Sequence, residues 1–272
     1  MVVPAPAKVN LFLHVTGRRD DGYHAIESLF VLVDLADTLT VARRDDGAIR
    51  RVRDVPGVPR DDDLVLRAAR ALQSASGTRF GMDYAIDKRI ATGAGLGGGS
   101  SDAASALLAL NRVWSLGWSR AALMDIARSV GADVPFFVGG ASALARGIGE
   151  RLTPVTMPPL WIVLVLPAVH VATASIFAAA ELTRDTPSAK MNVFSAVYGR
   201  NDLEPVAAAR HPEVASALNA LRRVAPHARM SGSGSAVFAA YGSEREALDA
   251  AARMPASRVV RTLARHPLAS FA

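Results

Sequence analysis

A glycine-dense segment in the middle of the chain has the composition of a phosphate-binding loop. Five of the seven residues from Gly93 to Gly99 are glycines, and Ser100, Ser101 and a helix-forming stretch follow directly. Because glycine lacks a Cβ, such a loop can wrap bare N–H groups around a bulky anion and can adopt positive φ. A helix beginning near Ser101 would add the positive end of its dipole. The segment therefore predicts a phosphate site.

The loop differs from the common nucleotide-binding motifs. Its glycine spacing fits a dinucleotide fingerprint, but residues 113–118 lack the acidic residue that would hold a ribose. The spacing also fits the first part of a P-loop, except that Gly99 stands where that motif needs its lysine. A cation for the phosphates must therefore come from elsewhere, and Lys8 and Lys88 are two of the three lysines of the chain. A flexible linker is the alternative, although a predicted strand and a capped helix flank the loop.

The composition excludes several kinds of site and partner. None of the 272 residues is a cysteine, which excludes disulfides, cysteine nucleophiles and thiolate metal sites. The longest apolar run, residues 160–169, is about half as long as a membrane span, and the N-terminus lacks the pattern of a secretory signal. We therefore expect a cytoplasmic protein that does not bind a membrane.

The net charge of +6 comes mostly from arginines that are scattered along the chain. Nucleic-acid-binding surfaces usually combine clustered basic residues with aromatic ones, whereas the tightest basic groups here are adjacent pairs, among them those at 43–44, 50–51 and 222–223. A basic solvated surface is the favoured interpretation, and it would attract a small polyanionic substrate. The sequence predicts no nucleic-acid partner and leaves the oligomeric state open.

The hydrophobic pattern predicts a mixture of strands and helices. Residues 9–15 alternate between apolar and polar types, which predicts a half-buried strand with Lys8 and Asn10 together on its polar face. Asp61 to Asp63 predict the N-cap of a helix that ends near Gly77. The other expected elements are strands over 29–35, 38–42, 49–52, 82–90, 161–166 and 236–241, helices over 101–114 and 119–131, and an irregular segment over 132–135.

A proline-rich stretch predicts the boundary between two parts of the chain. Three prolines lie within Thr153–Pro159, and such stretches usually connect elements rather than belong to them. We expect an N-terminal domain over residues 1–153, which contains the glycine loop, and a C-terminal domain over residues 154–272. Both contain strands and helices, so the predicted fold class is α+β.

Three motifs in this order resemble those of the GHMP kinases. They are PAKVNLFLHVTGRRDDGYH at residues 6–24, GAGLGGGSSDAA at 93–104 and MSGSGSAVFA at 230–239. The DGYH element, GADVPFFVGG at 131–140 and NDLE at 201–204 resemble in particular the members whose alcohol substrate carries a cytidine diphosphate group. The resemblance implies an ATP-dependent kinase of two lobes, the first like ribosomal S5 domain 2 and the second ferredoxin-like, with ATP and the small-molecule substrate between them.

The resemblance implies that Asp133 and Lys8 are the catalytic pair. Phosphorylation of an alcohol needs a carboxylate that accepts or orients the hydroxyl proton and a cation near the transferred charge. From residue types alone, Asp133 would sooner be a helix cap or turn residue, and Lys8 a solvent-facing side chain of an early strand.

The resemblance also assigns residues to ATP. The implied ATP-binding residues are Ala91, Thr92, Gly93, Ala94, Gly95, Leu96, Gly97, Gly98, Gly99, Ser100 and Ser101 in the loop, with Lys88 and Asp63 outside it. Ala91 replaces a usual proline, and Asp63 stands near the expected adenine where relatives often carry asparagine. Lys88 could instead pair with Asp87 or solvent. Mg²⁺ is expected with ATP; the hydroxyls of Ser100 and Ser101 are candidate ligands, and no carboxylate ligand is identified.

Substrate binding is implied at seven further positions. Tyr23 and Phe177 would stack on the two faces of a cytosine while His24 reads its polar edge. The others are Asn10, Thr173, Gly232 and Gly234. Without the resemblance, Tyr23 and His24 would be an ordinary turn and core pair, and Gly232 and Gly234 a plain hairpin turn.

Two other functions stay open. A different GHMP kinase acting on mevalonate, homoserine or a sugar would have the same loop but no use for a base-binding aromatic set. A nucleotide-binding regulator or nucleic-acid binder would fit the basic composition, but it would have no need of both Lys8 and Asp133.

Overall fold

The structure is a computed structural model that describes residues 1–189 and 198–272. The strands are β1 (Val2–Arg18), β2 (His24–Arg44), β3 (Ile49–Arg51), β4 (Gly81–Asp87), β5 (Ala143–Gly147), β6 (Arg151–Pro154), β7 (Trp161–Val165), β8 (Arg229–Met230), β9 (Val237–Tyr241) and β10 (Ser257–Leu263). The helices are α1 (Leu64–Ser76), α2 (Gly98–Val113), α3 (Arg120–Val130), α4 (Val134–Gly139), α5 (Thr173–Phe177), α6 (Glu204–Arg210), α7 (Pro212–Arg222) and α8 (Glu244–Ala251), with 3-10 turns η1 (Arg60–Asp62) and η2 (Ala269–Phe271).

Strand β2 connects the whole sheet, because it pairs along its length with β1, β4, β5 and β10. The sequence predicted two strands here, over 29–35 and 38–42, and that prediction was wrong. The strand continues through Asp37, whose buried carboxylate accepts hydrogen bonds from the backbone N–H groups of Arg89 and Ile90 at 2.5 and 2.8 Å. A charged residue inside a strand is stable here because it is bonded.

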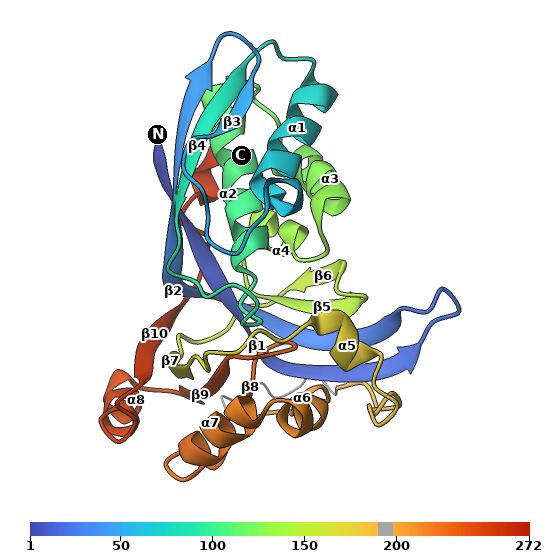
Figure 1. The fold of residues 1–272 in the computed structure, drawn as a ribbon, viewed down its shortest axis with the longest axis vertical. Coiled ribbons are helices and arrows are strands. Elements are labelled where there is room, and N and C mark those ends of the chain that lie inside the picture. Colours follow the sequence, from blue (N-terminus) through green and yellow to red (C-terminus); the bar gives the residue numbers. More distant parts are fainter. Residues whose placement is uncertain (190–197) are drawn as a thin grey trace.

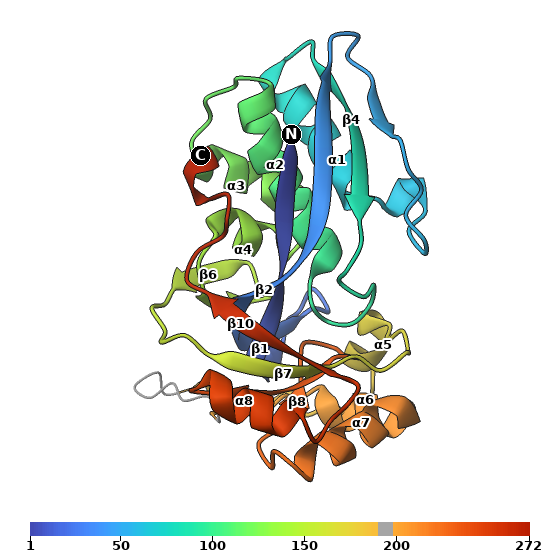
Figure 2. The ribbon, with the colours of Figure 1, turned by 90° about the vertical axis from the view of Figure 1, so that its left-hand side faces the viewer.

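Helices α1 to α4 cover one face of the long strands, and α6, α7 and α8 lie at the other end of the molecule (Figure 1, Figure 2). There α7 packs on β9, α8 packs on β7, β9 and β10, and α6 packs on α7. Helix α2 is buried over most of its length, since it packs between the sheet and helices α1 and α4. Each end has its own hydrophobic core, and a third cluster that contains Val9, Leu11 and Phe238 joins them. The architecture is α+β, as expected.

Strand β1 is buried on both faces, so the prediction of a half-buried strand was wrong. One face packs on helices, and the other packs on the C-terminal part of the chain, which local periodicity cannot reveal. Its pairing with β2 shifts register between Pro6 and Lys8 and again between Asn10 and Leu13. Such irregularities redirect side chains, and these two flank Lys8 and Asn10.

The predicted helix ends agree closely with the structure. Helix α1 ends at Gly77 in the left-handed conformation, and α3 lies between the N-cap Ser119 and Gly131. Helix α2 begins at Gly98, three residues before the expected Ser101.

The C-terminal turn returns to the N-terminal half (Figure 2). Asn111 Nδ2 in α2 donates to the carbonyl of Phe271 at 3.2 Å, and Arg120 donates to that of Ala269 at 2.6 Å. The division of the chain into residues 1–153 and 154–272 stays a prediction. These contacts place Ala269 and Phe271 against the N-terminal half of the chain.

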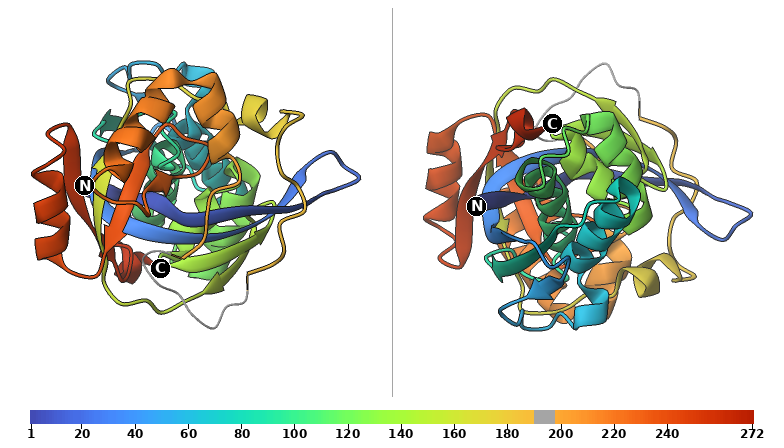
Figure 3. Two further views of the ribbon diagram at one scale, coloured as in Figure 1. Left: turned by 90° about the horizontal axis from the view of Figure 1, so that it is seen from below. Right: turned by 90° about the horizontal axis from the view of Figure 1, so that it is seen from above.

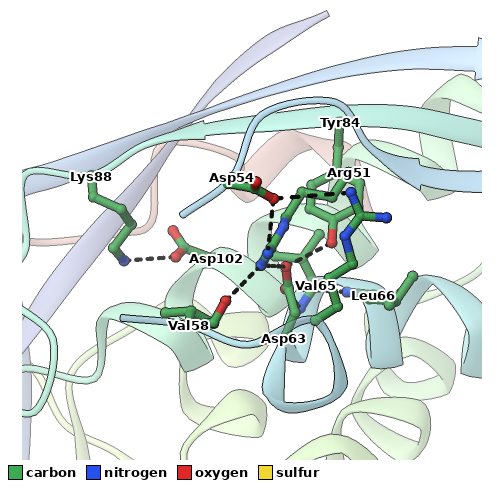
Figure 4. Close-up of polar contacts among 10 residues, drawn as sticks. Arg51, Asp54, Val58, Asp63, Val65, Leu66, Tyr84, Lys88 and Asp102 are labelled. Carbon is green, nitrogen blue, oxygen red and sulfur yellow. Dashed lines mark hydrogen bonds and ion pairs between the residues drawn. The ribbon is translucent and has the colours of Figure 1, made fainter. Parts of the chain in front are cut away.

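Asp63 fixes the start of α1 and belongs to a buried polar network (Figure 4). One carboxylate oxygen accepts from the backbone N–H groups of Val65 and Leu66 at 2.9 and 3.4 Å. The other accepts from the Tyr84 hydroxyl at 2.7 Å and from the Arg51 guanidinium at 3.1 Å. Burial, and then Asp63, raise the pKa of Tyr84, so its phenol remains a donor. Asp63 therefore ties α1 to β3 and β4.

We predict that Asp63→Ala destabilises the fold by about 3–5 kcal/mol, because it removes one partner of a buried ion pair and the helix cap. Urea denaturation would measure the free energy of unfolding. Asp61→Ala, a change at an exposed neighbour, is the matched control and should have little effect. Equal stability of the two variants would contradict this role.

Candidate active site

A cavity of about 1280 Å³ lies between the two halves of the molecule. Its lining includes all the predicted site residues except Ser101 and Gly234. The residues that it brings together are Lys8, Asn10, Tyr23, His24, Asp63, Lys88, Ala91, Thr92, Gly93, Ala94, Gly95, Leu96, Gly97, Gly98, Gly99, Ser100, Asp133, Thr173, Phe177 and Gly232. Residues distant in sequence thus share one site, with the glycine loop on one side of it.

The glycine loop is held by backbone contacts with both halves. The N–H of Lys8 donates to the carbonyl of Leu96, and the N–H of Ala236 donates to that of Ala94, both at 3.0 Å. Gly95 has φ of 73°, and a Cβ there would overlap the carbonyl oxygen of Ser231. Glycine is required at this position both for the conformation and for the close approach.

The N-terminus of α2 opens into the cavity directly after the loop. Gly97 is its N-cap in the left-handed conformation, and no side chain in the described part of the chain caps the first turn. The N–H groups of that turn and the helix dipole are therefore available to an anion.

Lys8 and Asp133 lie together in the cavity, with 3.8 Å between Lys8 Nζ and Asp133 Oδ2. Lys8 is only 4% exposed, so the alternative of a solvent-facing lysine was wrong. Burial lowers the pKa of Lys8, and Asp133 opposes that shift. Asp133 precedes α4 but makes no capping hydrogen bond with its side chain, which is 32% exposed. Its carboxylate therefore stays accessible from the cavity.

Asn10 positions the ammonium group of Lys8. Its Oδ1 accepts a hydrogen bond from Lys8 Nζ, and its Nδ2 donates to Ser28 Oγ at 2.8 Å. The Asn10 backbone N–H donates to Ser231 Oγ at 3.1 Å. A Cβ on Gly232 would lie 3.2 Å from Asn10 Oδ1, so this glycine allows the C-terminal half to approach Asn10 closely.

Lys88 binds two buried carboxylates, those of Asp37 and Asp102. Figure 4 shows its contact with Asp102. The alternative pairing of Lys88 with Asp87 was wrong, because Asp87 lies on the exposed side and its nearest ion-pair partner is Arg89 at 3.9 Å. Burial opposes the charge of Lys88, but Asp102 and Asp37 outweigh that effect and raise its pKa.

Asp102 is a functional candidate that the sequence reasoning missed. It lies in the second turn of α2 and lines the cavity. One oxygen accepts from Lys88 Nζ at 2.8 Å, whereas Oδ1 is buried and has no partner among the described residues. Burial raises the pKa of Asp102 to about 7, although Lys88 opposes this shift. The signal available in the sequence was a carboxylate immediately after the two serines of the loop.

Three predicted contacts need correction. Both oxygens of Asp63 are bonded within the protein, so its side chain has no free oxygen for the adenine. The Ser101 hydroxyl is buried and donates to the carbonyl of Pro6 at 2.6 Å, which turns it away from the cavity. The N–H of Gly234 donates to the carbonyl of Ser231 at 3.0 Å and so belongs to the turn itself.

The opposite end of the cavity carries the aromatic residues. Tyr23 is 62% exposed near the tip of the β1–β2 hairpin, which projects from the molecule (Figure 1, Figure 3). The rings of His24 and Phe177 lie 5.2 Å apart between centroids at an interplanar angle of 30°. Arg184, which the sequence reasoning missed, donates from Nε to His24 Nε2 at 2.9 Å. Thr173 Oγ1 lies 2.7 Å from Ser233 Oγ.

Two family models match this chain. The model of the GHMP kinases N terminal domain matches residues 63–141, and that of the GHMP kinases C terminal matches residues 178–259. A protein of Cupriavidus necator named 4-diphosphocytidyl-2-C-methyl-D-erythritol kinase is 57% identical over 99% of this chain and 95% of its own. The kinase of that name from Cupriavidus metallidurans is 55% identical with the same coverage. The chain belongs to the GHMP kinases, in the 4-diphosphocytidyl-2-C-methyl-D-erythritol kinase family.

The solved structures agree with this assignment. A crystal structure of 4-(cytidine 5'-diphospho)-2C-methyl-D-erythritol kinase is 36% identical, superposes with a TM-score of 0.83 and covers 97% of this chain and 99% of its own. A homoserine kinase from Cytophaga hutchinsonii, at 17% identity and a TM-score of 0.72 over 97% of this chain and 94% of its own, shares the fold. The protein is therefore an ATP-dependent kinase with the two-lobed GHMP kinase fold. No helix in the described ranges is long and apolar enough to span a membrane.

We predict that Gly95→Ala lowers kcat/KM about 100-fold, since the new Cβ would displace the loop from Ser231 and misplace the phosphates. Steady-state kinetics and ATP titration would measure the loss. Gly242→Ala is the control, because a Cβ there meets nothing within 4 Å. Wild-type kinetics for Gly95→Ala would show that catalysis does not need the close approach of Gly95 to Ser231.

Proposed function

We propose that this kinase transfers the γ-phosphoryl group of ATP to the 2-hydroxyl of 4-diphosphocytidyl-2-C-methyl-D-erythritol, giving the 2-phosphate and ADP. The observation that carries the proposal is the position of the Lys8–Asp133 pair in one cavity with the glycine loop and the His24–Phe177 aromatic pair. The names of the similar kinases support the same substrate. The reaction belongs to the non-mevalonate route to isoprenoid precursors, and we expect it in the cytoplasm.

In this mechanism Asp133 orients the substrate hydroxyl and accepts its proton. The hydroxyl oxygen attacks the γ-phosphorus, the bond from that phosphorus to the β–γ bridging oxygen breaks, and ADP leaves. Lys8, held by Asn10, faces the charge that develops on the transferred group. The loop amides and the α2 N-terminus bind the donor phosphates.

The residues present also fit a magnesium ion. Mg²⁺ prefers oxygen ligands and usually takes one or two carboxylates together with water and substrate phosphates. The Asp102 carboxylate, whose Oδ1 has no partner among the described residues, and the hydroxyl of Ser100 would hold it beside the loop. When bound, the ion would neutralise charge on the phosphates. Lys88 would hold the Asp102 carboxylate in place through their 2.8 Å contact.

The aromatic end would bind the cytidine. Tyr23 and Phe177 offer flat apolar surfaces for stacking, and His24 offers a ring nitrogen to a polar edge. A GHMP kinase that acts on mevalonate or homoserine would have no base for these side chains to bind. This end of the cavity therefore favours the cytidine substrate over those alternatives.

We predict that Asp133→Asn lowers kcat by about 10²–10⁴-fold, because an amide cannot accept the hydroxyl proton. ADP release in a coupled assay measures turnover, and calorimetric titration should give an ATP affinity close to that of the wild type. Asp125→Asn, at an exposed carboxylate of α3, is the matched control. Full activity of Asp133→Asn would contradict this mechanism.

We also predict that CDP raises the melting temperature, whereas mevalonate and homoserine do not, because only CDP offers a base and a diphosphate to the cavity. Thermal-shift measurements with each compound at equal concentration test this. Stabilisation by mevalonate or homoserine without an effect of CDP would favour the alternative kinase.

A further inference from the structure

All three guanidinium nitrogens of Arg184 donate hydrogen bonds at the aromatic end of the cavity. Nε donates to His24 Nε2 at 2.9 Å. The remaining N–H groups donate to four backbone carbonyls of the segment that begins at the end of α5, those of Phe177, Ala179, Ala180 and Leu182, at 3.2, 2.6, 3.4 and 2.9 Å. A guanidinium bonded in this way has little freedom to move or turn.

This contact fixes which nitrogen of His24 carries the proton. A guanidinium only donates hydrogen bonds and stays charged at any pH that a protein tolerates. His24 Nε2 must therefore accept, which leaves the proton of the neutral ring on Nδ1. Protonation of both nitrogens would point an N–H at the guanidinium. Burial, together with Arg184 and Arg18, lowers the pKa of His24 and keeps the ring neutral.

We propose that Arg184 is the positioning residue for base recognition: it holds His24 in the Nδ1-protonated form, so that the imidazole presents a donor to the acceptor edge of a cytosine. This inference rests on the proposed function. Cytosine offers acceptors at N3 and O2, whereas N3 of uracil carries a hydrogen and only its carbonyl oxygens accept, so a fixed donor that faces N3 favours cytosine. No described residue accepts a hydrogen bond from Nδ1, and His24 lines the cavity.

The Arg184 side chain also links the two aromatic residues, His24 and Phe177. Arg184 bonds the carbonyl of Phe177 and the ring of His24, which come from parts of the chain more than 150 residues apart. The two rings are thereby held at their 5.2 Å separation. A base that stacks on Phe177 would therefore lie at a fixed distance from the His24 ring.

The first test needs no mutation. Full-length protein labelled with ¹⁵N in histidine should give, at neutral pH, a His24 Nε2 shift of an unprotonated nitrogen and an Nδ1 shift of a protonated one. Arg184→Lys and Arg184→Ala should shift both signals away from these values. Arg210→Ala is the matched control, because Arg210 bonds the carbonyl of Ser175 in the same region without touching His24. A proton on Nε2 in the wild type would overturn the proposal.

The second test measures discrimination between CDP and UDP. The wild type should favour CDP, and Arg184→Ala should reduce that preference about tenfold, the worth of one hydrogen bond. In a His24→Asn background the amide supplies a donor that cannot change tautomer, so the same Arg184 change should leave the preference unaltered. Equal losses in both backgrounds would show that Arg184 only supports the loop, and would refute the proposal.

The proposed kinase activity and the role of Arg184 are tested separately by these experiments. If the wild type neither binds CDP nor releases ADP with the diphosphocytidyl substrate, the proposed function is wrong. If it does both, but the preference for CDP survives in Arg184→Ala as it does in Arg210→Ala, only the role of Arg184 is wrong.

Discussion

The site depends on the close approach of three backbone segments, namely strand β1, the glycine loop and the turn after β8. Hydrogen bonds from Lys8 to Leu96 and from Ala236 to Ala94 join them. They can meet only because Gly95 has no Cβ to collide with Ser231. This contact brings the two halves of the molecule together around one cavity, in which Lys8 and Asp133 lie beside the glycine loop.

The close approach also buries the Lys8 ammonium, which would be costly without partners. Asn10 and Asp133 supply them, and Ser28 and Ser231 hold Asn10 in turn. A desolvated, fixed cation interacts more strongly with developing phosphoryl charge than a solvated one would. Lys88 likewise lies between the carboxylates of Asp37 and Asp102, so each of the two lysines beside the loop has an ion-pair partner within the protein.

Local sequence signals located the loop and the helix ends, because those are set by glycine conformation and capping near in sequence. Nearly every residue that the family resemblance named lines the cavity. What the resemblance could not give was the direction of a side chain. The resemblance assigned both Asp63 and Ser101 to ATP, yet Asp63 bonds Arg51 and Tyr84, and Ser101 bonds Pro6. These partners come from distant strands, which no local pattern encodes.

The sequence by itself determined a phosphate loop without its own lysine, and its resemblance to the GHMP kinases pointed to Lys8 and Asp133, which we propose act on the acceptor. Only the tertiary structure decided which groups are free to act. Among the described residues, the Asp133 side chain makes no capping hydrogen bond, Asp102 Oδ1 has no partner, and Arg184 reaches His24. The reason is physical, since a polar side chain is available to a ligand only when packing has not already supplied its hydrogen-bond partners.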